Sequence, residues 1–268
     1  MSSCTLAFFR VLGGVAVLGA ISGVAGGQET PRMPDGRPDL SGVWFGGFQP
    51  ALNAATDGKS ICLLGCEELA GPDSDAPTGV VVPPVERPSY KAEYRAKVGD
   101  LDARQVIEDP VLRCENPGLP RIGAPDKIIQ NARELVFLYD DVNGSFWRIV
   151  PIDGEPREDL EPTFLGDAVG TWEGDTLVVE TVNFNDETWL TDDGSFHTES
   201  LRVVERLTRR GDTLEYRVTA HDPEVLTEPW VKQPMMLELN DFELVESPPC
   251  RERDLPLMQD LSSHDNPR

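Results

Sequence analysis

The sequence has few basic residues and very few histidines. Its 268 residues contain 24 Lys and Arg against 47 Asp and Glu, which gives a formal net charge of −23, and they include only three His. Nucleic-acid binding depends on clustered Lys and Arg, so a chain this acidic is not expected to bind a phosphate backbone or to adhere to an anionic membrane. The acidity is typical of a protein that stays soluble in a periplasm or an extracellular medium.

Motifs for cofactor binding and for common hydrolase chemistry are also missing. The sequence has no glycine-rich loop that would cradle a phosphate and no dinucleotide fingerprint. None of Ser145, Ser195 and Ser200 stands in the Gly-x-Ser-x-Gly context of a hydrolase nucleophile. Beyond the first 27 residues no stretch is apolar enough to span a membrane. We therefore expect neither a bound cofactor nor membrane insertion.

The first 27 residues have a composition of their own. Arg10 precedes an apolar run from Val11 to Val24, and small residues follow up to Gly27. This pattern is typical of a secretory signal peptide, because the run is shorter than the ~20 residues that cross a bilayer. No Leu-x-x-Cys sequence marks a lipid anchor. The pattern predicts a periplasmic or secreted protein, and a buried N-terminal helix is the alternative.

After this leader an even number of cysteines remains. Cys4 lies within the leader, which leaves Cys62, Cys66, Cys114 and Cys250. In an oxidising compartment these predict two disulfides, and several pairings are open. A local Cys62–Cys66 clasp with a long-range Cys114–Cys250 tie is favoured. A zinc clip at Cys62 and Cys66 is the alternative, but no His lies near them.

Turn signals alternate with short β-type segments from residue 133 onward. Asn143-Gly144 is the strongest of these signals, because a tight hairpin turn requires positive φ at its central positions. With a strand at 41–45, the segments predict an all-β fold in which an antiparallel meander closes into a barrel. A two-sheet sandwich is the alternative. The expected hairpins pair 134–140 with 146–152, 168–172 with 176–182, 200–208 with 213–221, and 231–239 with 242–246.

The other segments are expected to be irregular or helical. Residues 28–40 are expected to form an extended linker ahead of a single domain at 41–250. Within that domain, residues 49–130 form a long excursion of loops and one helix, and its irregular first part at 49–88 would serve as a lid when ordered. The excursion contains one helix, expected at 88–106 from helically spaced apolar residues. The polar tail at 251–268 is expected to be disordered.

Two resemblances bear on this domain. Gly42-Val43-Trp44 resembles the Gly-x-Trp opening of lipocalins and other calycin barrels, and it implies a calycin-like barrel whose Trp plugs the closed end, although the long insertion after Phe48 departs from the lipocalin meander. A broader pattern resembles a large group of uncharacterised exported bacterial proteins, and it implies no reaction. The pattern comprises Asp109-Pro110-x-x-x-Cys114-x-x-Pro117-Gly118-x-Pro120-Arg121, Gly170-x-Trp172-Glu173-Gly174-Asp175-Thr176-Leu177-Val178-Val179-Glu180-Thr181, His197-x-Glu199-x-Leu201-x-Val203-x-Glu205-Arg206, and Asp222-Pro223 through Pro229-Trp230.

The candidate catalytic residues come from three of the predicted strands. Because side chains alternate along a strand, His197, Glu199 and Glu205 share one face that is otherwise apolar. Glu180 is expected on the corresponding face of the preceding strand, and Arg148 on an earlier strand would face them as a cation. Charges on a buried face are costly unless they are paired, so these five residues form the candidate catalytic set.

Three interpretations of this set stay open. His197 can act as a general acid or base, oriented by a glutamate, while Arg148 stabilises negative charge; this suits a cofactor-independent lyase, isomerase, hydratase or hydrolase. Alternatively, His197, Glu199 and Glu180 bind a divalent metal such as zinc or iron. In the third interpretation the glutamates form structural ion pairs with Arg148 or other nearby arginines, and His197 is a satisfied turn residue.

The expected ligand is a small hydrophobic or aromatic molecule held in the barrel. Trp189, in the loop between two carboxylate-bearing strands, is the expected aromatic group at the pocket mouth, and Tyr139 and Phe146 complete the ligand-binding set. Conversion of this ligand by His197 is the leading functional prediction. A carrier without turnover and an interaction module for an envelope assembly are the alternatives.

Overall fold

The fold is taken from a computed structural model that describes residues 29–46, 51–54, 60–64, 81–82, 87–157, 159–246 and 249–253. The predicted leader, Cys66 and the tail after residue 253 lie outside the described residues. No helix in the described ranges combines the length and the apolar character needed to cross a membrane.

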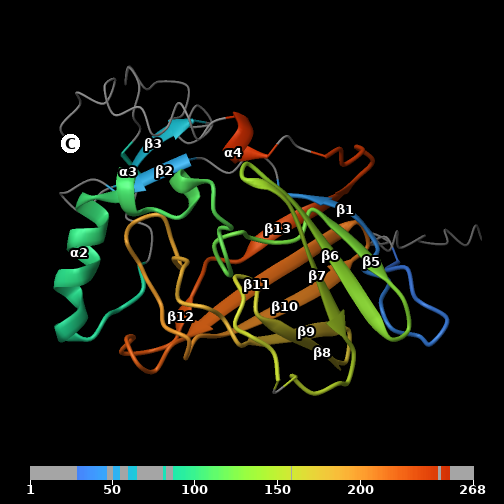
Figure 1. The fold of residues 1–268 in the computed structure, drawn as a ribbon. Coiled ribbons are helices and arrows are strands. Elements are labelled where there is room, and N and C mark those ends of the chain that lie inside the picture. The colour runs from blue at the N-terminus through green and yellow to red at the C-terminus, as the bar shows by residue number, and fades with distance from the viewer. Residues whose placement is uncertain are drawn as a thin grey trace, which may run out of the picture.

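The described chain is mostly β and forms one nearly closed antiparallel sheet with the shape of a barrel (Figure 1). Its strands are β1 (Gly42–Phe45), β5 (Lys127–Gln130), β6 (Glu134–Asp141), β7 (Gly144–Pro151), β8 (Asp167–Glu173), β9 (Thr176–Val182), β10 (Arg202–Arg210), β11 (Thr213–His221), β12 (Trp230–Val231) and β13 (Met235–Asn240). Their hydrogen-bonded order is β7-β6-β5-β1-β13-β11-β10-β9-β8, with β12 paired to β11. The predicted antiparallel β-barrel is confirmed, and the alternative two-sheet sandwich is not formed.

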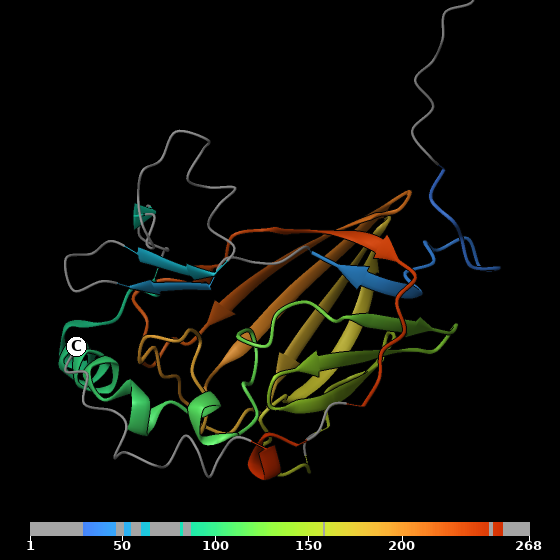
Figure 2. The same cartoon turned by 90° about the horizontal axis from the view of Figure 1, so that it is seen from above.

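The barrel closes along one line of its wall. Figure 2 shows β5 to β7 on one side and β8 to β11 on the other, with β1 and β13 between them. Because each of the nine strands on the path is antiparallel to its neighbour, the two outermost strands, β7 and β8, run in the same direction. A parallel bridge joins Ile152 to Gly170 there, and the Asp153 N–H donates to the Gly170 carbonyl at 2.8 Å. We call the line between β7 and β8 the seam.

Side-chain alternation fills the barrel interior. On β6 the buried residues are Leu135, Phe137 and Tyr139, and the residues between them face outward. The same period of two places Glu205 among buried aliphatic residues on β10. Full burial of each large apolar side chain contributes about 1.5–3 kcal/mol, so this inner layer is the main stabilising feature of the fold.

The two ends of the barrel differ. At one end, which we call the turn end, short turns at 131–133, 174–175 and 211–212 join neighbouring strands. At the other, the loop end, the chain makes long connections at 183–201 and 222–229. The long excursion after β1 also returns to the loop end.

Trp44 is buried at the turn end, with 1% of its surface exposed. Its indole N–H donates to the Leu40 carbonyl at 2.9 Å, and the Arg209 guanidinium lies 5.0 Å from its ring centroid. Arg209 in turn donates to the Asp39 carbonyl at 2.5 Å. Trp44 therefore plugs this end of the barrel.

The lead-in before β1 is more than a tether. Leu40 is fully buried, and the Gly211 N–H donates to the Thr30 hydroxyl at 2.9 Å. Arg32 pairs with Asp175 at 2.8 Å in the turn between β8 and β9. The expected linker thus packs against the turn end from its first described residues, because its polar groups satisfy the backbone of the turns.

The helix expected at 88–106 is shorter and interrupted. Its first residues are extended, because Tyr90 forms a bridge with Leu226. Arg104 then departs from helical geometry, with φ −110° and ψ 20°, and divides the rest. The helical elements are η1 (Ala92–Tyr94), α2 (Arg95–Ala103), α3 (Gln105–Glu108), η2 (Val111–Arg113) and α4 (Cys250–Arg253).

Several strand assignments differ from the prediction. Residues 242–246 form no strand, and the segment expected at 231–239 is divided into β12 and β13, because Pro234 has no N–H to contribute to a ladder. β5 lies in the stretch expected to be irregular, where Pro and Gly signals precede it. A small separate sheet contains β2 (Ala51–Ala54), β3 (Ser60–Leu64) and β4 (Val81–Val82).

The long-range disulfide is confirmed. Cys114 and Cys250 are bonded, with their Cα atoms 5.4 Å apart and a sequence separation of 136. The bond ties the segment after η2 to α4. The predicted Cys62–Cys66 clasp lies outside the residues whose side chains the structure describes.

Candidate functional site

A buried ion pair occupies the middle of the barrel. Arg148 on β7 and Glu205 on β10 have side chains that are 3% and 0% exposed, and Arg148 Nη2 lies 2.8 Å from both Glu205 carboxylate oxygens. The sequence placed both residues inside, and the third interpretation paired Arg148 with a glutamate. Removing one member of such a pair leaves an uncompensated buried charge, which costs about 3–5 kcal/mol.

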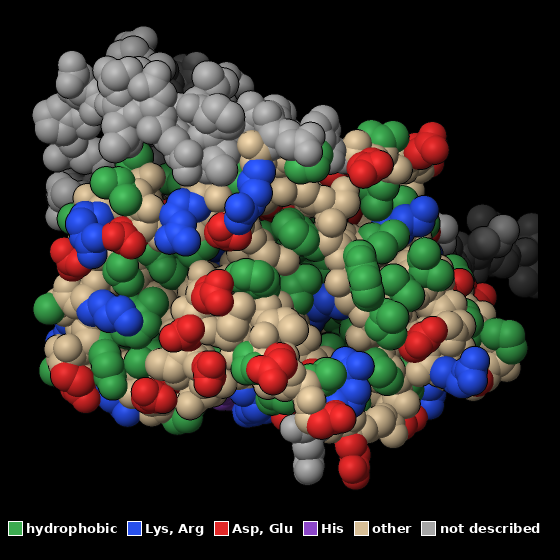
Figure 3. All heavy atoms as spheres, viewed as in Figure 1, with side chains coloured by type: hydrophobic (Ala, Val, Ile, Leu, Met, Phe, Trp, Pro, Cys, Tyr) green, Lys and Arg blue, Asp and Glu red, His purple; other side chains and the backbone are tan. Residues whose placement is uncertain are grey.

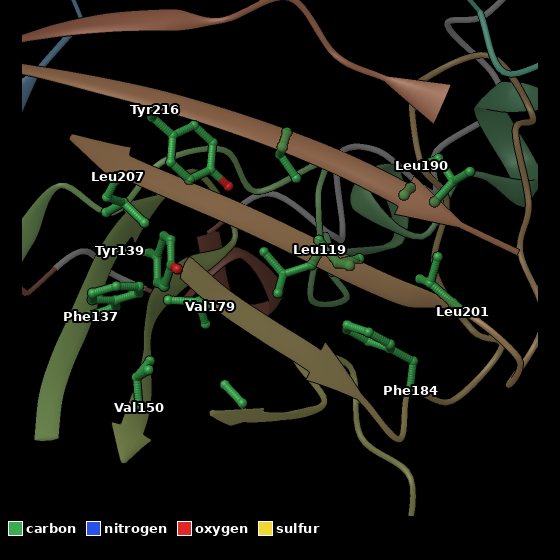
Figure 4. Packing of buried hydrophobic residues seen from close by; sticks show 14 of the residues in the cluster. Leu119, Phe137, Tyr139, Val150, Val179, Phe184, Leu190, Leu201, Leu207 and Tyr216 are labelled. Carbon is green, nitrogen blue, oxygen red and sulfur yellow. The ribbon is translucent and has the colours of Figure 1, made fainter. Parts of the chain in front are cut away.

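Three further side chains complete the network around this pair. The Tyr139 hydroxyl accepts from Arg148 Nε at 3.0 Å and from Nη2 at 2.7 Å. Thr181 Oγ1 accepts from Arg148 Nη1 at 3.3 Å, and the Tyr216 hydroxyl donates to Glu205 at 3.0 Å. Figure 4 shows both tyrosines among the packed core side chains. The members of the network therefore come from five strands, β6, β7, β9, β10 and β11.

Burial sets the protonation states of the network. It raises the pKa of Tyr139 and of Tyr216 above the ordinary tyrosine value, so both hydroxyls keep their protons. Burial alone would lower the pKa of Arg148, but Glu205 and the two tyrosines more than offset this and raise it. Arg148 is consequently a permanent cation, and the network as a whole is neutral.

Glu180 does not join this network, contrary to the sequence-based prediction. Its side chain is 51% exposed and pairs with Arg202 at 3.2 Å on the outer wall. The inward face of β9 is formed by Leu177, Val179 and Thr181, one residue out of the expected register. Thr181 takes the inward place that was assigned to Glu180.

His197 is buried, but it lies in the loop before β10 and not on the strand itself. Its Nε2 lies 2.7 Å from Thr188 Oγ1, and its Nδ1 lies 3.1 Å from the Thr198 carbonyl oxygen. Both ring nitrogens therefore have partners inside the protein. Burial lowers the pKa of His197, so the neutral imidazole is favoured near neutral pH.

The metal set suggested by the sequence is not assembled. Glu199 is exposed, and Glu180 lies on the outer wall with Arg202. Neither carboxylate accompanies His197 into the interior. Within the described ranges, no group of three or more His, Cys, Asp or Glu residues is arranged to hold a metal ion.

The three aromatic residues expected at the ligand have different environments. Tyr139 belongs to the buried network, and Phe146 is half-buried against the core. Trp189 is buried, 5% exposed, and bridges Phe196 within its own loop. Trp189 lines neither of the cavities described below, so its expected place at a pocket mouth is not observed there.

Residues 114–122, which we call the plug loop, cover the loop end. Leu119 is fully buried and lies among the core side chains in Figure 4. Arg121 donates to both oxygens of Asp109 at 2.7 and 2.8 Å, and the Asn143 amide donates to the Glu115 carbonyl at 2.8 Å. The loop is therefore fixed at both ends, and the sequence identified its pattern without indicating that it closes the barrel.

A groove lies along the outer side of the seam. It encloses about 520 Å³ between β7 and β8 and is continued by Glu155, Arg157 and residues 163–167. Arg148 lines it, so the buried network reaches this surface at one point. Trp147 and Ile149 stand at its β7 side, 64% and 47% exposed. Figure 3 shows hydrophobic side chains gathered over β6 and β7, beside a hollow in the surface.

A second, smaller cavity lies on the opposite side of the network. It encloses about 190 Å³ and is lined by Trp44, Tyr139, Asp126 and Met235 among others. Burial raises the pKa of Asp126, and the charges of the neighbouring carboxylates on β6 add to this rise. Tyr139 thus lines one cavity, and its hydroxyl oxygen accepts hydrogen bonds from Arg148, which lines the other.

Comparison of the chain with protein-family models, with curated proteins and with solved structures finds no match.

Proposed function

We propose that this protein is a binding protein for a small, largely apolar molecule, which it holds in the groove at the seam without converting it. The observation that carries the proposal is the groove of about 520 Å³ with the buried Arg148 at its lining. Ligand pockets commonly have volumes of about 300–1,000 Å³ and combine apolar walls with a few placed polar groups.

The walls of the groove support an apolar ligand. Phe164, Leu165 and Val169 line it from the β8 side, and Trp147 and Ile149 line it from β7. Apolar side chains that are exposed together on a protein surface often mark a site that a ligand covers. A molecule lying between these walls would remove both sets from water.

Turnover by His197 has less support than binding. His197 lines neither cavity, and both of its ring nitrogens are engaged by Thr188 and Thr198. A general base needs to come within hydrogen-bond reach of a substrate proton. An enzyme acting through His197 would first have to break these two contacts.

Export to an oxidising compartment is part of the proposal. The Cys114–Cys250 bond is consistent with such a compartment, because disulfides persist in secreted and periplasmic proteins and are rare in the cytosol. The signal-peptide pattern of the first 27 residues supports the same location. Mass measurement of the protein recovered from its host's periplasm or medium tests whether the leader is removed.

A binding test uses Nile red, a neutral apolar dye, with the full exported protein. Ile149→Glu places a charge at the edge of the groove and is expected to weaken dye binding by about tenfold or more, since 1.4 kcal/mol corresponds to a factor of ten. Ile129→Glu is the matched control, because Ile129 on β5 is 49% exposed yet does not line the groove. Equal effects of the two substitutions, or no dye binding together with no retained molecule in native mass spectrometry, would overturn the proposal.

A further inference from the structure

Arg148 retains a hydrogen-bond donor at the groove. A guanidinium carries five N–H groups, two of them on each Nη atom. Arg148 Nε and Nη2 are occupied by Tyr139 and Glu205. On Nη1 the contact among the described residues is Thr181 Oγ1 at 3.3 Å, which uses one of its two N–H groups. The other is left for an acceptor, and Arg148 lines the groove.

The charged side chains that line the groove carry no net positive charge, although one of them supplies this donor. Glu205 neutralises Arg148, and Asp167 neutralises Arg157 through contacts that include Nε to Oδ1 at 3.0 Å. Glu155 adds a negative charge to the lining, and the whole chain carries −23. An anionic ligand would therefore meet an unfavourable potential, with no unpaired cation at the groove to offset it.

The apolar walls limit what else the ligand can carry. Arg148 is only 4% exposed, so an acceptor that reaches it must enter a site largely shielded from water. A charged group loses several kcal/mol of hydration on entering such a site, whereas a carbonyl oxygen loses much less and regains a hydrogen bond.

We infer that the ligand of the groove is an uncharged apolar molecule bearing an acceptor oxygen, such as a ketone, ester or amide carbonyl, which accepts from Arg148 Nη1. This inference rests on the proposed binding function, and it names the chemical class of the ligand. It assigns Arg148 the role of a specificity-determining residue.

The test compares three naphthalene probes that differ in one substituent of the same shape. Acetylnaphthalene carries a carbonyl, isopropenylnaphthalene replaces its oxygen with a methylene group, and naphthoate carries a carboxylate. All are titrated against the full exported protein at neutral pH. We expect acetylnaphthalene to bind about tenfold more tightly than isopropenylnaphthalene, as befits one hydrogen bond to a charged donor. Naphthoate is expected to bind more weakly than acetylnaphthalene.

The outcomes separate this inference from the proposed function. Equal affinity for acetylnaphthalene and isopropenylnaphthalene, or tightest binding of naphthoate, overturns the inference while leaving a binding protein. Failure of all three probes together with failure of Nile red overturns the proposed function, and the inference with it.

A double variant shows whether Arg148 is the donor. Arg148→Leu with Glu205→Leu removes both charges, and replacement of a buried pair by apolar residues of similar volume commonly leaves folding intact. We expect the preference for the carbonyl probe to disappear. The matched control is Arg202→Leu with Glu180→Leu, a surface pair at 3.2 Å, which should keep the preference. A carbonyl preference that survives in a folded Arg148→Leu, Glu205→Leu variant overturns the inference.

Discussion

The Nε2 atom of His197 lies 2.7 Å from the Oγ1 atom of Thr188, inside the protein and away from both cavities. This contact joins two parts of the single connection, residues 183–201, that leads from β9 to β10. It indicates that a histidine selected from the sequence for catalysis instead stabilises the folded shape of this one connection at the loop end of the barrel.

His197→Ala is expected to destabilise the fold. The substitution removes a buried ring and leaves Thr188 and the Thr198 carbonyl without their partner, so we expect a loss of about 2–4 kcal/mol in urea unfolding. His221→Ala is the control, because His221 at the end of β11 is only half-buried. An unchanged unfolding free energy for His197→Ala would favour a catalytic histidine instead of a structural one.

Stability is expected to fall on mild acidification through His197. Because burial lowers its folded pKa, the unfolded chain takes up the proton first as the pH falls. The stabilising contribution is therefore complete above the unfolded pKa of about 6.5 and is lost below it. Unfolding free energies measured on either side of this pH should differ less in His197→Gln than in the natural sequence. An equal pH dependence in both proteins would contradict the assignment.

The central ion pair is expected to show strong coupling. Arg148→Leu or Glu205→Leu alone should cost about 3–5 kcal/mol, and the double variant should cost less than either. The outer pair Glu180 and Arg202 should contribute about 1 kcal/mol or less, because both side chains are exposed. A double-mutant cycle on each pair, measured by chemical unfolding, checks the contrast. Additive losses at Arg148 and Glu205 would mean that the two charges do not interact.

Alanine substitutions at two glycines in or next to the plug loop separate the cost of backbone strain from the cost of a steric clash. Gly118 has φ +70°, and an added Cβ would lie 2.3 Å from Thr188 Oγ1. Gly123 has φ +85° but has open space around the same position. Both Ala substitutions carry a backbone cost of about 1–2 kcal/mol, and only Gly118→Ala adds a clash. Thermal unfolding should therefore rank Gly118→Ala well below Gly123→Ala; equal melting temperatures would contradict the close contact with Thr188.

The long-range disulfide is expected to contribute strongly to stability. Replacing Cys114 and Cys250 together by Ser should lower the unfolding free energy by about 4–5 kcal/mol on the chain-entropy argument, since the bond closes a long loop. A Cys62–Cys66 bond would close only a short loop, so replacing these two cysteines should change the unfolding free energy less. Thiol alkylation followed by mass measurement reports whether the Cys62–Cys66 bond forms at all.

Local signals predicted the strands well, because each hairpin carries its own turn residues. The turn at Asn143-Gly144 and the alternation on β10 were sufficient to place Arg148 and Glu205 inside the barrel. The register of β9 could not be predicted in this way, because each face of that strand combines apolar with polar residues. A shift of one residue exchanges Glu180 for Thr181, and no local signal decides between them.

Long-range contacts were beyond sequence reasoning for a different reason. The close approach of Gly118 to Thr188 joins two segments that local patterns treat as independent. The sequence motifs in the plug loop and in the loop that contains His197 come close together only in the folded barrel. The groove is equally non-local, because β7 and β8 meet only after the sheet has curved fully round.

The odd number of antiparallel strands on the path from β7 to β8 has a mechanical consequence for the barrel. Strands that run in the same direction cannot be linked by a hairpin, and β7 and β8 are held to each other in the described chain by the single bridge at Ile152 and Gly170. Every other pair of neighbours is fastened by a ladder. We therefore expect the backbone amides along this line to exchange with solvent at the lowest energetic cost, because separation of β7 from β8 would leave every hairpin of the wall paired.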